Sequence, residues 1–205
     1  VGRQALDANT TASDNTACGY QSLLSNTTGS RGTAIGSYSL DSNTTGSYNS
    51  ALGFQSLQEN TTGSQNTGLG YKALEANTTA DNNTAVGYLT LQANTTGEKN
   101  VVVGAAAKLN NTTGSQNTVV GYYADGADTD NDYVTAIGYH ALRNNTASGN
   151  TALGWTAAEE NTTGSINTAI GKQALRYNTT GVQNTAVGEQ AMEGSSGSST
   201  PSYCT

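Results

Sequence analysis

Three aspartates at alternate positions are the side chains whose type and spacing are best suited to binding a metal ion. Asp128, Asp130 and Asp132 lie in the segment DGADTDND at residues 125–132. Carboxylate oxygens two residues apart can converge on one Ca²⁺, although Tyr133 stands where a calcium-binding loop needs its sharp-turn glycine and no closing Glu follows. The segment therefore predicts either a calcium site or an acidic surface turn.

Residues for catalysis are sparse. The single histidine, His140, lies between Tyr139 and Ala141, at a place where other parts of the chain carry Gln21 or Gln55. The sequence contains no His–Cys cluster for zinc, no pair of positioned carboxylates and no glycine loop followed by Lys. We expect His140 to be a surface variant, and we expect the protein not to be an enzyme and to need no cofactor apart from the calcium ion considered above.

Asn-x-Thr sequons, which are acceptors for N-linked glycans, recur along the chain. They begin at Asn9, Asn26, Asn43, Asn60, Asn77, Asn82, Asn94, Asn110, Asn111, Asn144, Asn161 and Asn178. A repeated Asn turn can instead stack its side chains into a ladder that caps neighbouring backbone groups. Glycosylation and an Asn ladder are both consistent with the pattern.

The composition indicates a regular array rather than an ordinary globular domain. Apolar residues make up 34% and charged residues 11% of the 205 residues, with a single Pro, His, Trp, Met and Phe. The net charge is −7 with only eight Lys and Arg, so we exclude nucleic acid as a partner. No apolar run is long enough for a membrane helix, so we expect no membrane insertion in this segment.

The two cysteines are too few for a disulfide framework. Cys18 occupies a position that elsewhere carries Val, Ile or Leu, which predicts a buried thiol. Cys204 lies in the Gly/Ser/Thr-rich tail of residues 194–205, where an intermolecular disulfide or a link to further sequence is a hypothesis. Because the sequence begins with Val1 rather than Met, we expect a piece of a longer protein.

A repeat organises residues 1–193. The glycines that align are Gly2, Gly19, Gly36, Gly53, Gly70, Gly87, Gly104, Gly121, Gly138, Gly154, Gly171 and Gly188. Their spacing is constant except for the step from Gly138 to Gly154, which is one residue shorter because of a deletion within residues 144–149. A unit this short and rich in β-branched residues predicts one coil of a parallel β-solenoid or β-roll, an all-β fold of about twelve 17-residue coils.

Each coil offers two candidate strands. One is the Thr-Ala-Val/Ile segment, as at Thr168–Ile170, and the other is the Tyr-x-Ala-Leu segment, as at Tyr71–Leu74. The glycine separates them, and Asn-Thr-Thr-Gly, as at Asn60–Gly63, makes a second turn.

The alternation of a strand predicts which rows point inward. The apolar residue before each glycine, as at Ile35 or Val120, is expected inside, on one face with the Thr row two residues earlier. The residue between these rows is Ala, Gly or Val, so the strand is apolar on both faces, which predicts a partner chain. The aromatic residues after the glycines and the Leu residues four positions after them form further apolar rows, and we expect part of this surface to pack on another chain. The aromatic row is Tyr20, Phe54, Tyr71, Tyr88, Tyr122, Tyr139 and Trp155, and the Leu row is Leu23, Leu40, Leu57, Leu74, Leu91, Leu142 and Leu175.

The Asn-Thr-Ala-Val/Ile-Gly and Tyr-x-Ala-Leu segments resemble the head repeats of YadA-like trimeric autotransporter adhesins and related phage tail-fibre repeats. The unit here is longer than the usual repeat of that family. The resemblance implies a left-handed parallel β-roll, a homo-trimer around a common axis and an extracellular fibre at a cell or virion surface that attaches to a host surface or matrix ligand.

Two alternatives accompany this hypothesis. The first is a filament-forming subunit, with or without glycans, that polymerises end to end through the open edges of its terminal coils. The second is ice binding, because ice-binding solenoids also carry a regular row of Thr side chains. We expect the Thr row to be buried with the apolar row, which argues against ice binding.

Overall fold

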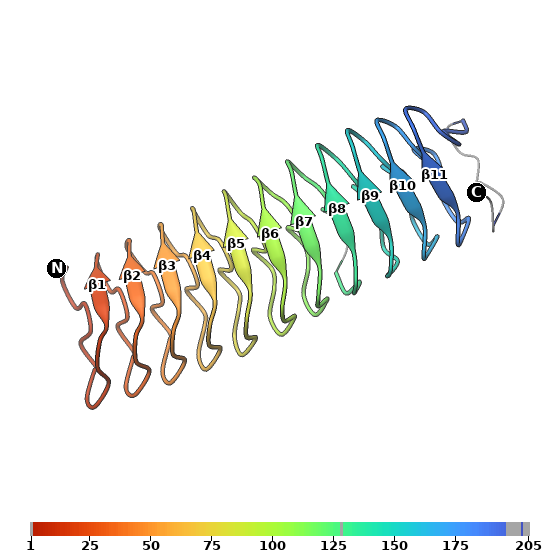
Figure 1. The fold of residues 1–205 in the computed structure, drawn as a ribbon. Coiled ribbons are helices and arrows are strands. Elements are labelled where there is room, and N and C mark those ends of the chain that lie inside the picture. The colour runs from red at the N-terminus through yellow and green to blue at the C-terminus, as the bar shows by residue number, and fades with distance from the viewer. Residues whose placement is uncertain (1, 128, 196–201, 203–205) are drawn as a thin grey trace.

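The computed structural model describes residues 2–127, 129–195 and 202, and these form a straight rod (Figure 1). One parallel sheet of eleven strands runs along the rod, with every strand hydrogen-bonded to its neighbours in chain order. The strands are β1 (Thr16–Cys18), β2 (Thr33–Ile35), β3 (Ser50–Leu52), β4 (Thr67–Leu69), β5 (Thr84–Val86), β6 (Val101–Val103), β7 (Thr118–Val120), β8 (Thr135–Ile137), β9 (Thr151–Leu153), β10 (Thr168–Ile170) and β11 (Thr185–Val187). The described part of the chain contains no helix.

The register follows the sequence repeat and confirms the β-solenoid. Thr16 pairs with Thr33, which stands one full repeat unit later in the chain. Thr135 pairs with Thr151, which is one residue short of a full unit, because the deletion falls between them. The eleven strands define ten strand-to-strand turns. The expected count of twelve coils is not confirmed, since a strand ending before Gly2 would include Val1, which lies outside the described residues.

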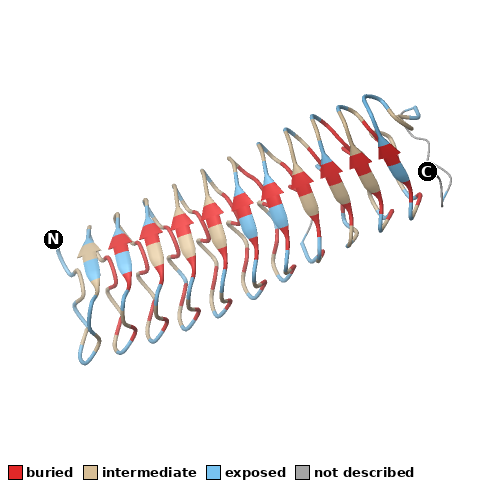
Figure 2. Cartoon of the chain, in the orientation of Figure 1, coloured by how far each residue is buried: buried red, intermediate tan, exposed pale blue. Residues whose placement is uncertain are grey.

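The predicted orientation of the strand residues is wrong. The middle residue is buried, as at Ala34 and Ala136, while the residues on either side are exposed or half-buried (Figure 2), so the middle residue is the inward one. Ile35 is 40% exposed, and the Thr row, which begins at Thr16, is exposed or half-buried throughout. The space inside the coil is limited: most strands place Ala there, the largest residues at this position are Val102 and Val119, and the Ile and Leu residues of the strands lie on the outer side.

The second predicted strand is also wrong. The segment after each glycine is a turn in which the second and fourth residues have left-handed backbone angles, as at Lys72 (φ 55°) and Leu74 (φ 55°). Hydrogen bonds between coils support these strained residues, since Leu74 N donates to Thr90 O over 3.1 Å. This geometry turns the Leu row inward, and Leu23, Leu40, Leu57, Leu74, Leu91, Leu142 and Leu175 are all buried in the coil's own core.

Asn side chains line the opposite turn as a ladder in two runs, from Asn9 to Asn111 and from Asn145 to Asn178, because the position between the runs is Asp128. Asn60 Nδ2 donates to Oδ1 of Asn43 over 2.8 Å and to Gly63 O over 2.9 Å, and the same pattern recurs from coil to coil. A second row precedes the strands, where Asn66 Oδ1 accepts from the backbone nitrogen of Asn83 over 2.9 Å. Because buried polar groups must be paired, these ladders fix the spacing of the coils.

Candidate functional site

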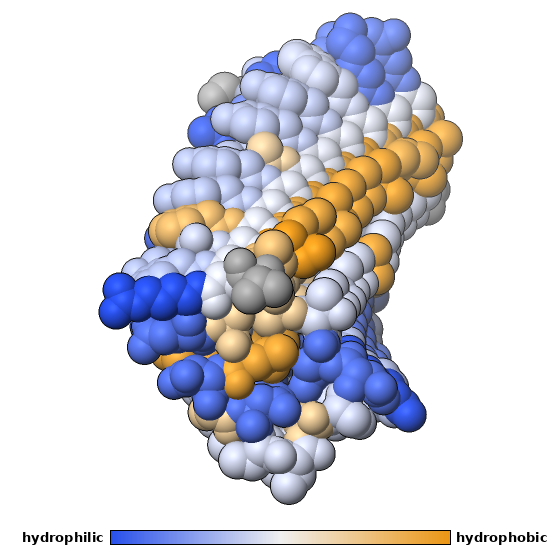
Figure 3. Space-filling model, turned by 90° about the vertical axis from the view of Figure 1, so that its left-hand side faces the viewer, coloured by the Kyte–Doolittle hydropathy of each residue, from blue (hydrophilic) through white to orange (hydrophobic). Residues whose placement is uncertain are grey.

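An exposed aliphatic row on the outer face of the sheet is the most extended apolar feature of the surface. Residues of this row include Ile35 (40% exposed), Leu52 (49%), Val103 (37%), Val120 (37%), Leu153 (44%) and Val187 (66%). A continuous apolar band runs along the rod in Figure 3. Large exposed apolar surfaces of this kind mark interaction sites on soluble proteins.

Stacked aromatic rings form a second exposed row, directly after the strand-ending glycines. Phe54 and Tyr71 stack with centroids 5.6 Å apart, and Tyr71 and Tyr88 continue the stack at 5.3 Å. A second run joins Tyr122 to Tyr139 at 5.6 Å and Tyr139 to Trp155 at 6.4 Å. Seven residues of this row are 37–55% exposed, namely Tyr20, Phe54, Tyr71, Tyr88, Tyr122, Tyr139 and Trp155. Their exposure adds to the apolar surface that this molecule presents.

The Thr row lies on the same outer face as the aliphatic row. Thr33, Thr118 and Thr185 are exposed, and each is followed two residues later by an exposed aliphatic side chain. This arrangement contradicts the expectation that the Thr row is buried. The sequence identified both rows but placed them on the wrong side of the strand. Cys18 belongs to the aliphatic row, so its thiol is exposed rather than buried as predicted.

The predicted calcium ligands differ in their surroundings. Asp128 lies outside the described residues, Asp130 is exposed, and Asp132 accepts a hydrogen bond from the backbone nitrogen of Ser115 over 2.7 Å. Asp81 has the same role toward Ser64, at 2.6 Å, so Asp132 occupies an ordinary position of the repeat. Among the described residues no group of three acidic, His or Cys side chains has the arrangement of a metal site. Calcium binding at this turn stays a prediction.

His140 is packed against its neighbours rather than freely exposed. Its ring stacks on Tyr139 with centroids 3.9 Å apart, and Nδ1 lies 3.3 Å from Oε1 of Glu159. Glu159 also accepts a hydrogen bond from Nε of Arg176 over 3.1 Å and has Arg143 3.9 Å away. This cluster binds three consecutive coils together, and no pocket opens beside it or elsewhere on the described surface.

The Asn ladder also bears on glycosylation. Eight sequon residues are buried with Nδ2 donating to a backbone oxygen, namely Asn26, Asn43, Asn60, Asn77, Asn94, Asn111, Asn161 and Asn178. A glycan bond to Nδ2 would break this ladder. Asn82 and Asn110 are exposed, and Asn9 and Asn144 are half-buried, so the accessible acceptors are few.

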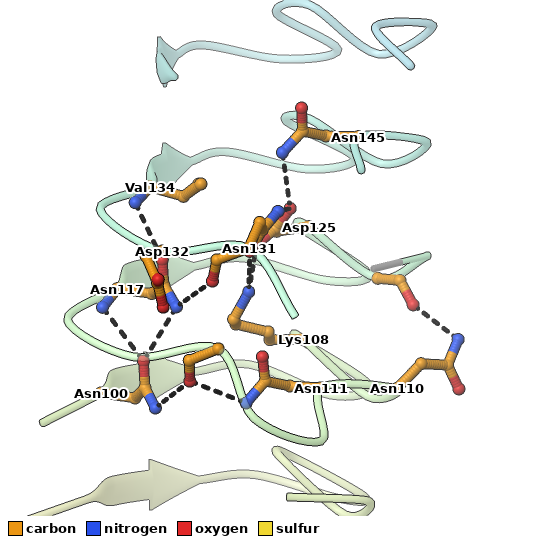
Figure 4. Close-up of polar contacts among 12 residues, drawn as sticks. Asn100, Lys108, Asn110, Asn111, Asn117, Asp125, Asn131, Asp132, Val134 and Asn145 are labelled. Atoms are coloured by element: carbon orange, nitrogen blue, oxygen red, sulfur yellow. Dashed lines mark hydrogen bonds and ion pairs between the residues drawn. The ribbon is translucent and has the colours of Figure 1, made fainter. Parts of the chain in front are cut away.

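A buried polar cluster was missed by sequence reasoning. Lys108 and Asp125 stand in the Leu row, are fully buried, and form an ion pair with Nζ 2.7 Å from Oδ2 (Figure 4). Asn131 stands where the turn normally has Gly, and its Oδ1 accepts a hydrogen bond from Lys108 Nζ. The signal was present in the sequence, because these three residues depart from the repeat at neighbouring positions of consecutive coils.

Comparisons with family models, with curated proteins and with solved structures give no match for this chain. Within the described residues, no helix has the length and hydrophobicity that crossing a bilayer requires. The geometry therefore defines the class of molecule as a tandem-repeat β-solenoid that carries an outward apolar face along the length of the rod.

Proposed function

We propose that this chain is a non-catalytic segment of an extracellular fibre at a cell or virion surface, in which three copies pack around a common axis. The single observation that carries the proposal is the exposed aliphatic row, which includes Leu52 and Leu153 and accompanies the aromatic row along the sheet. Ten strand-to-strand steps of about 4.8 Å make this face about 50 Å long. A face of this length, if covered, provides the apolar core of a stable interface.

The distribution of apolar and polar side chains supports parallel packing of several copies. The aliphatic row accompanies an apolar band along the rod (Figure 3), whereas the Asn-Thr-Thr turns carry polar side chains. Parallel rods that turn their apolar sides to a shared axis bury those sides and leave the turns in water. The three-fold number follows the resemblance to adhesin head repeats, and any host ligand would then contact the turns.

Light scattering combined with sedimentation, on the intact chain at several concentrations, tests this function. A constant mass of three chains supports the fibre segment. A monomer at all concentrations contradicts it. Growth of mass with concentration, with long fibres in electron micrographs, favours instead an end-to-end filament built through the two ends of the described sheet, at β1 and β11.

A second candidate function is ice binding, and one specific observation favours it. The Thr row is outward, regularly spaced and in line with the aliphatic row, as at Thr118 and Val120. A monomeric rod would present this face to water, where the regular Thr row would bind the surface of an ice crystal. Thermal hysteresis in a monomeric preparation would support ice binding, while a trimer without hysteresis would exclude it.

A further inference from the structure

We propose that Lys108 and Asn131 become joined by an intramolecular amide bond, formed by the folded chain itself and promoted by Asp125. The proposal concerns the interior of the rod and does not depend on how its apolar face is used. The three residues are 0%, 2% and 0% exposed, respectively. Figure 4 shows their side chains meeting between consecutive coils.

The first argument is the cost of the cluster. Lys108 and Asp125 replace two consecutive residues of the Leu row, between Leu91 and Leu142, which are both buried. A buried ion pair is seldom more stable than the apolar residues that it replaces, because both charges lose their hydration. The neighbouring coils of this chain carry Leu at this position. The stability of the fold alone therefore does not explain the ion pair of Lys108 and Asp125.

The second argument is the geometry of the Asp125 carboxylate, which contacts both nitrogen atoms that an amide exchange would involve. Oδ2 accepts a hydrogen bond from Lys108 Nζ over 2.7 Å, and Oδ1 accepts one from Asn131 Nδ2 over 3.1 Å. Lys108 Nζ also donates to Asn131 Oδ1, which places the amine beside the side-chain amide. The carboxylate is therefore placed to take a proton from the attacking nitrogen and to give one to the leaving nitrogen.

The third argument is that the surroundings hold these atoms in place. Asn145 Nδ2 donates to Asp125 Oδ1 over 3.3 Å, and Asn117 Nδ2 donates to the backbone oxygen of Asn131 over 3.0 Å. Backbone hydrogen bonds join Lys108 N to Ala124 O and Asp125 N to Ala141 O, each at 2.9 Å. Reacting groups that are held in contact in this way gain rate because little entropy remains to be lost.

The reaction balances without any other reagent. Lys108 Nζ transfers a proton to Asp125, and its lone pair then attacks Cγ of Asn131. The new C–N bond forms, the oxyanion collapses, and the bond from Cγ to Nδ2 breaks while Asp125 delivers a proton to the departing nitrogen. Ammonia leaves and binds the proton that remains, so the protein loses one ammonium ion, no atom is oxidised or reduced, and Asp125 is regenerated.

Mass spectrometry of the intact, folded chain tests the proposal. We expect a mass below that of the sequence by one ammonia. Trypsin then gives the location, because cleavage at Lys99 and Arg143 leaves residues 100–143 as one peptide when the Lys108 amine is in an amide bond. An unlinked chain is cut after Lys108 into residues 100–108 and 109–143. A full mass, or a missing ammonia with normal cleavage after Lys108, overturns the proposal.

Matched variants separate chemistry from folding. Asp125→Asn keeps the size of the side chain but removes the proton acceptor, so we expect the full mass and cleavage after Lys108. The double variant Lys108→Leu, Asp125→Leu restores the Leu row and should fold with the full mass. Loss of ammonia together with a protected Lys108 in Asp125→Asn would exclude the role given to Asp125, and loss of water in the parent chain would place the bond at Asp125 instead of Asn131.

Discussion

Asn60 and Asn43 are joined by a hydrogen bond of 2.8 Å between equivalent side chains of consecutive coils, and this bond is one step of a ladder that runs through the buried turn. Asn60 Oδ1 in turn accepts from Asn77 Nδ2 over 2.7 Å. Each side chain therefore connects the coil before it to the coil after it. The turn is held together by buried polar groups. Removal of one Asn side chain would therefore leave its neighbours in the ladder without a hydrogen-bond partner.

Asn60→Ala should lower the free energy of unfolding by about 1–3 kcal/mol, because the oxygens of Asn43 and Gly63 lose their donor while they stay buried. Urea denaturation followed by circular dichroism measures the change. The matched control is Asn82→Gln, at an exposed position where equivalent residues are Gln65 and Gln116. An equal loss of stability in both variants would contradict the ladder's importance.

The two faces of one strand should respond differently to an added charge. Leu153→Asp places a carboxylate on the outer face, where Leu153 is 44% exposed, and should reduce a trimer to monomers without loss of β structure. Ala152→Asp places it inside the coil, where Ala152 is fully buried, and should cost several kcal/mol of folding free energy, on the order of an unpaired buried charge.

Sedimentation and circular dichroism together distinguish these two outcomes. A Leu153→Asp variant that unfolds would mean that the outer face is needed within the monomer. A Leu153→Asp variant that keeps the mass of three chains would place the interface on another surface.

The sequence predicted the repeat period, the parallel stack of coils and the position of the deletion. This was possible because each repeat unit contributes one strand to the sheet, so the pairing of strands follows the spacing of the repeat. It did not predict which strand face is inside. Thr33, Ala34 and Ile35 are all compatible with either side of a sheet, and the limited space inside the coil, which accepts Ala or Val, favours Ala34 as the inward residue. The apolar row was recognised as a feature but assigned to the wrong side.

The turn after each glycine and the polar cluster were missed for different reasons. Leu74 looks like a strand residue because nothing in its type indicates a φ of 55°, which hydrogen bonds from neighbouring coils impose. Lys108, Asp125 and Asn131 are far enough apart in the chain that only the stacking of coils brings them together. Their departure from the repeat indicated a special position without indicating that they touch.

Glycines at the ends of the strands should differ in their tolerance of Ala according to how closely a neighbouring coil approaches them. Gly53 has φ +137°, and a Cβ added there would lie 2.4 Å from the backbone oxygen of Gly70. Gly188 has φ +128°, but among the described residues the nearest atom to an added Cβ is the Cβ of Ala191, 3.9 Å away. Gly188→Ala should therefore cost about 1–3 kcal/mol from backbone strain alone, and Gly53→Ala should cost clearly more.

Urea midpoints of the two glycine variants, measured in parallel, give the comparison. Since the backbone angles are similar, the difference reports on the overlying coil. Equal midpoints would mean that the stack relaxes around an added methyl group and that the close approach of coils at this row is not required.

Asp41 should make stability depend on pH. Burial, and second the negative charge of Glu59, raise the pKa of the Asp41 carboxyl above its ordinary value. One of its oxygens, Oδ1, is buried without a hydrogen-bond partner. A raised folded-state pKa means that the folded chain takes up this proton before the unfolded chain does, so this contribution to stability is present at acid pH and is lost as pH rises through the folded-state pKa.

Asp41→Asn removes the charge without changing the size of the side chain, and should raise the urea midpoint at neutral pH. At about pH 3, below the ordinary range of an Asp carboxyl, the advantage should disappear because the parent residue is then protonated as well. Asp7→Asn is the matched control, since Asp7 has the same place in its repeat unit but is exposed, and should change the midpoint little at either pH. An Asp41→Asn variant that is less stable than the parent at neutral pH would show that the carboxylate has a favourable partner and that burial does not penalise its charge.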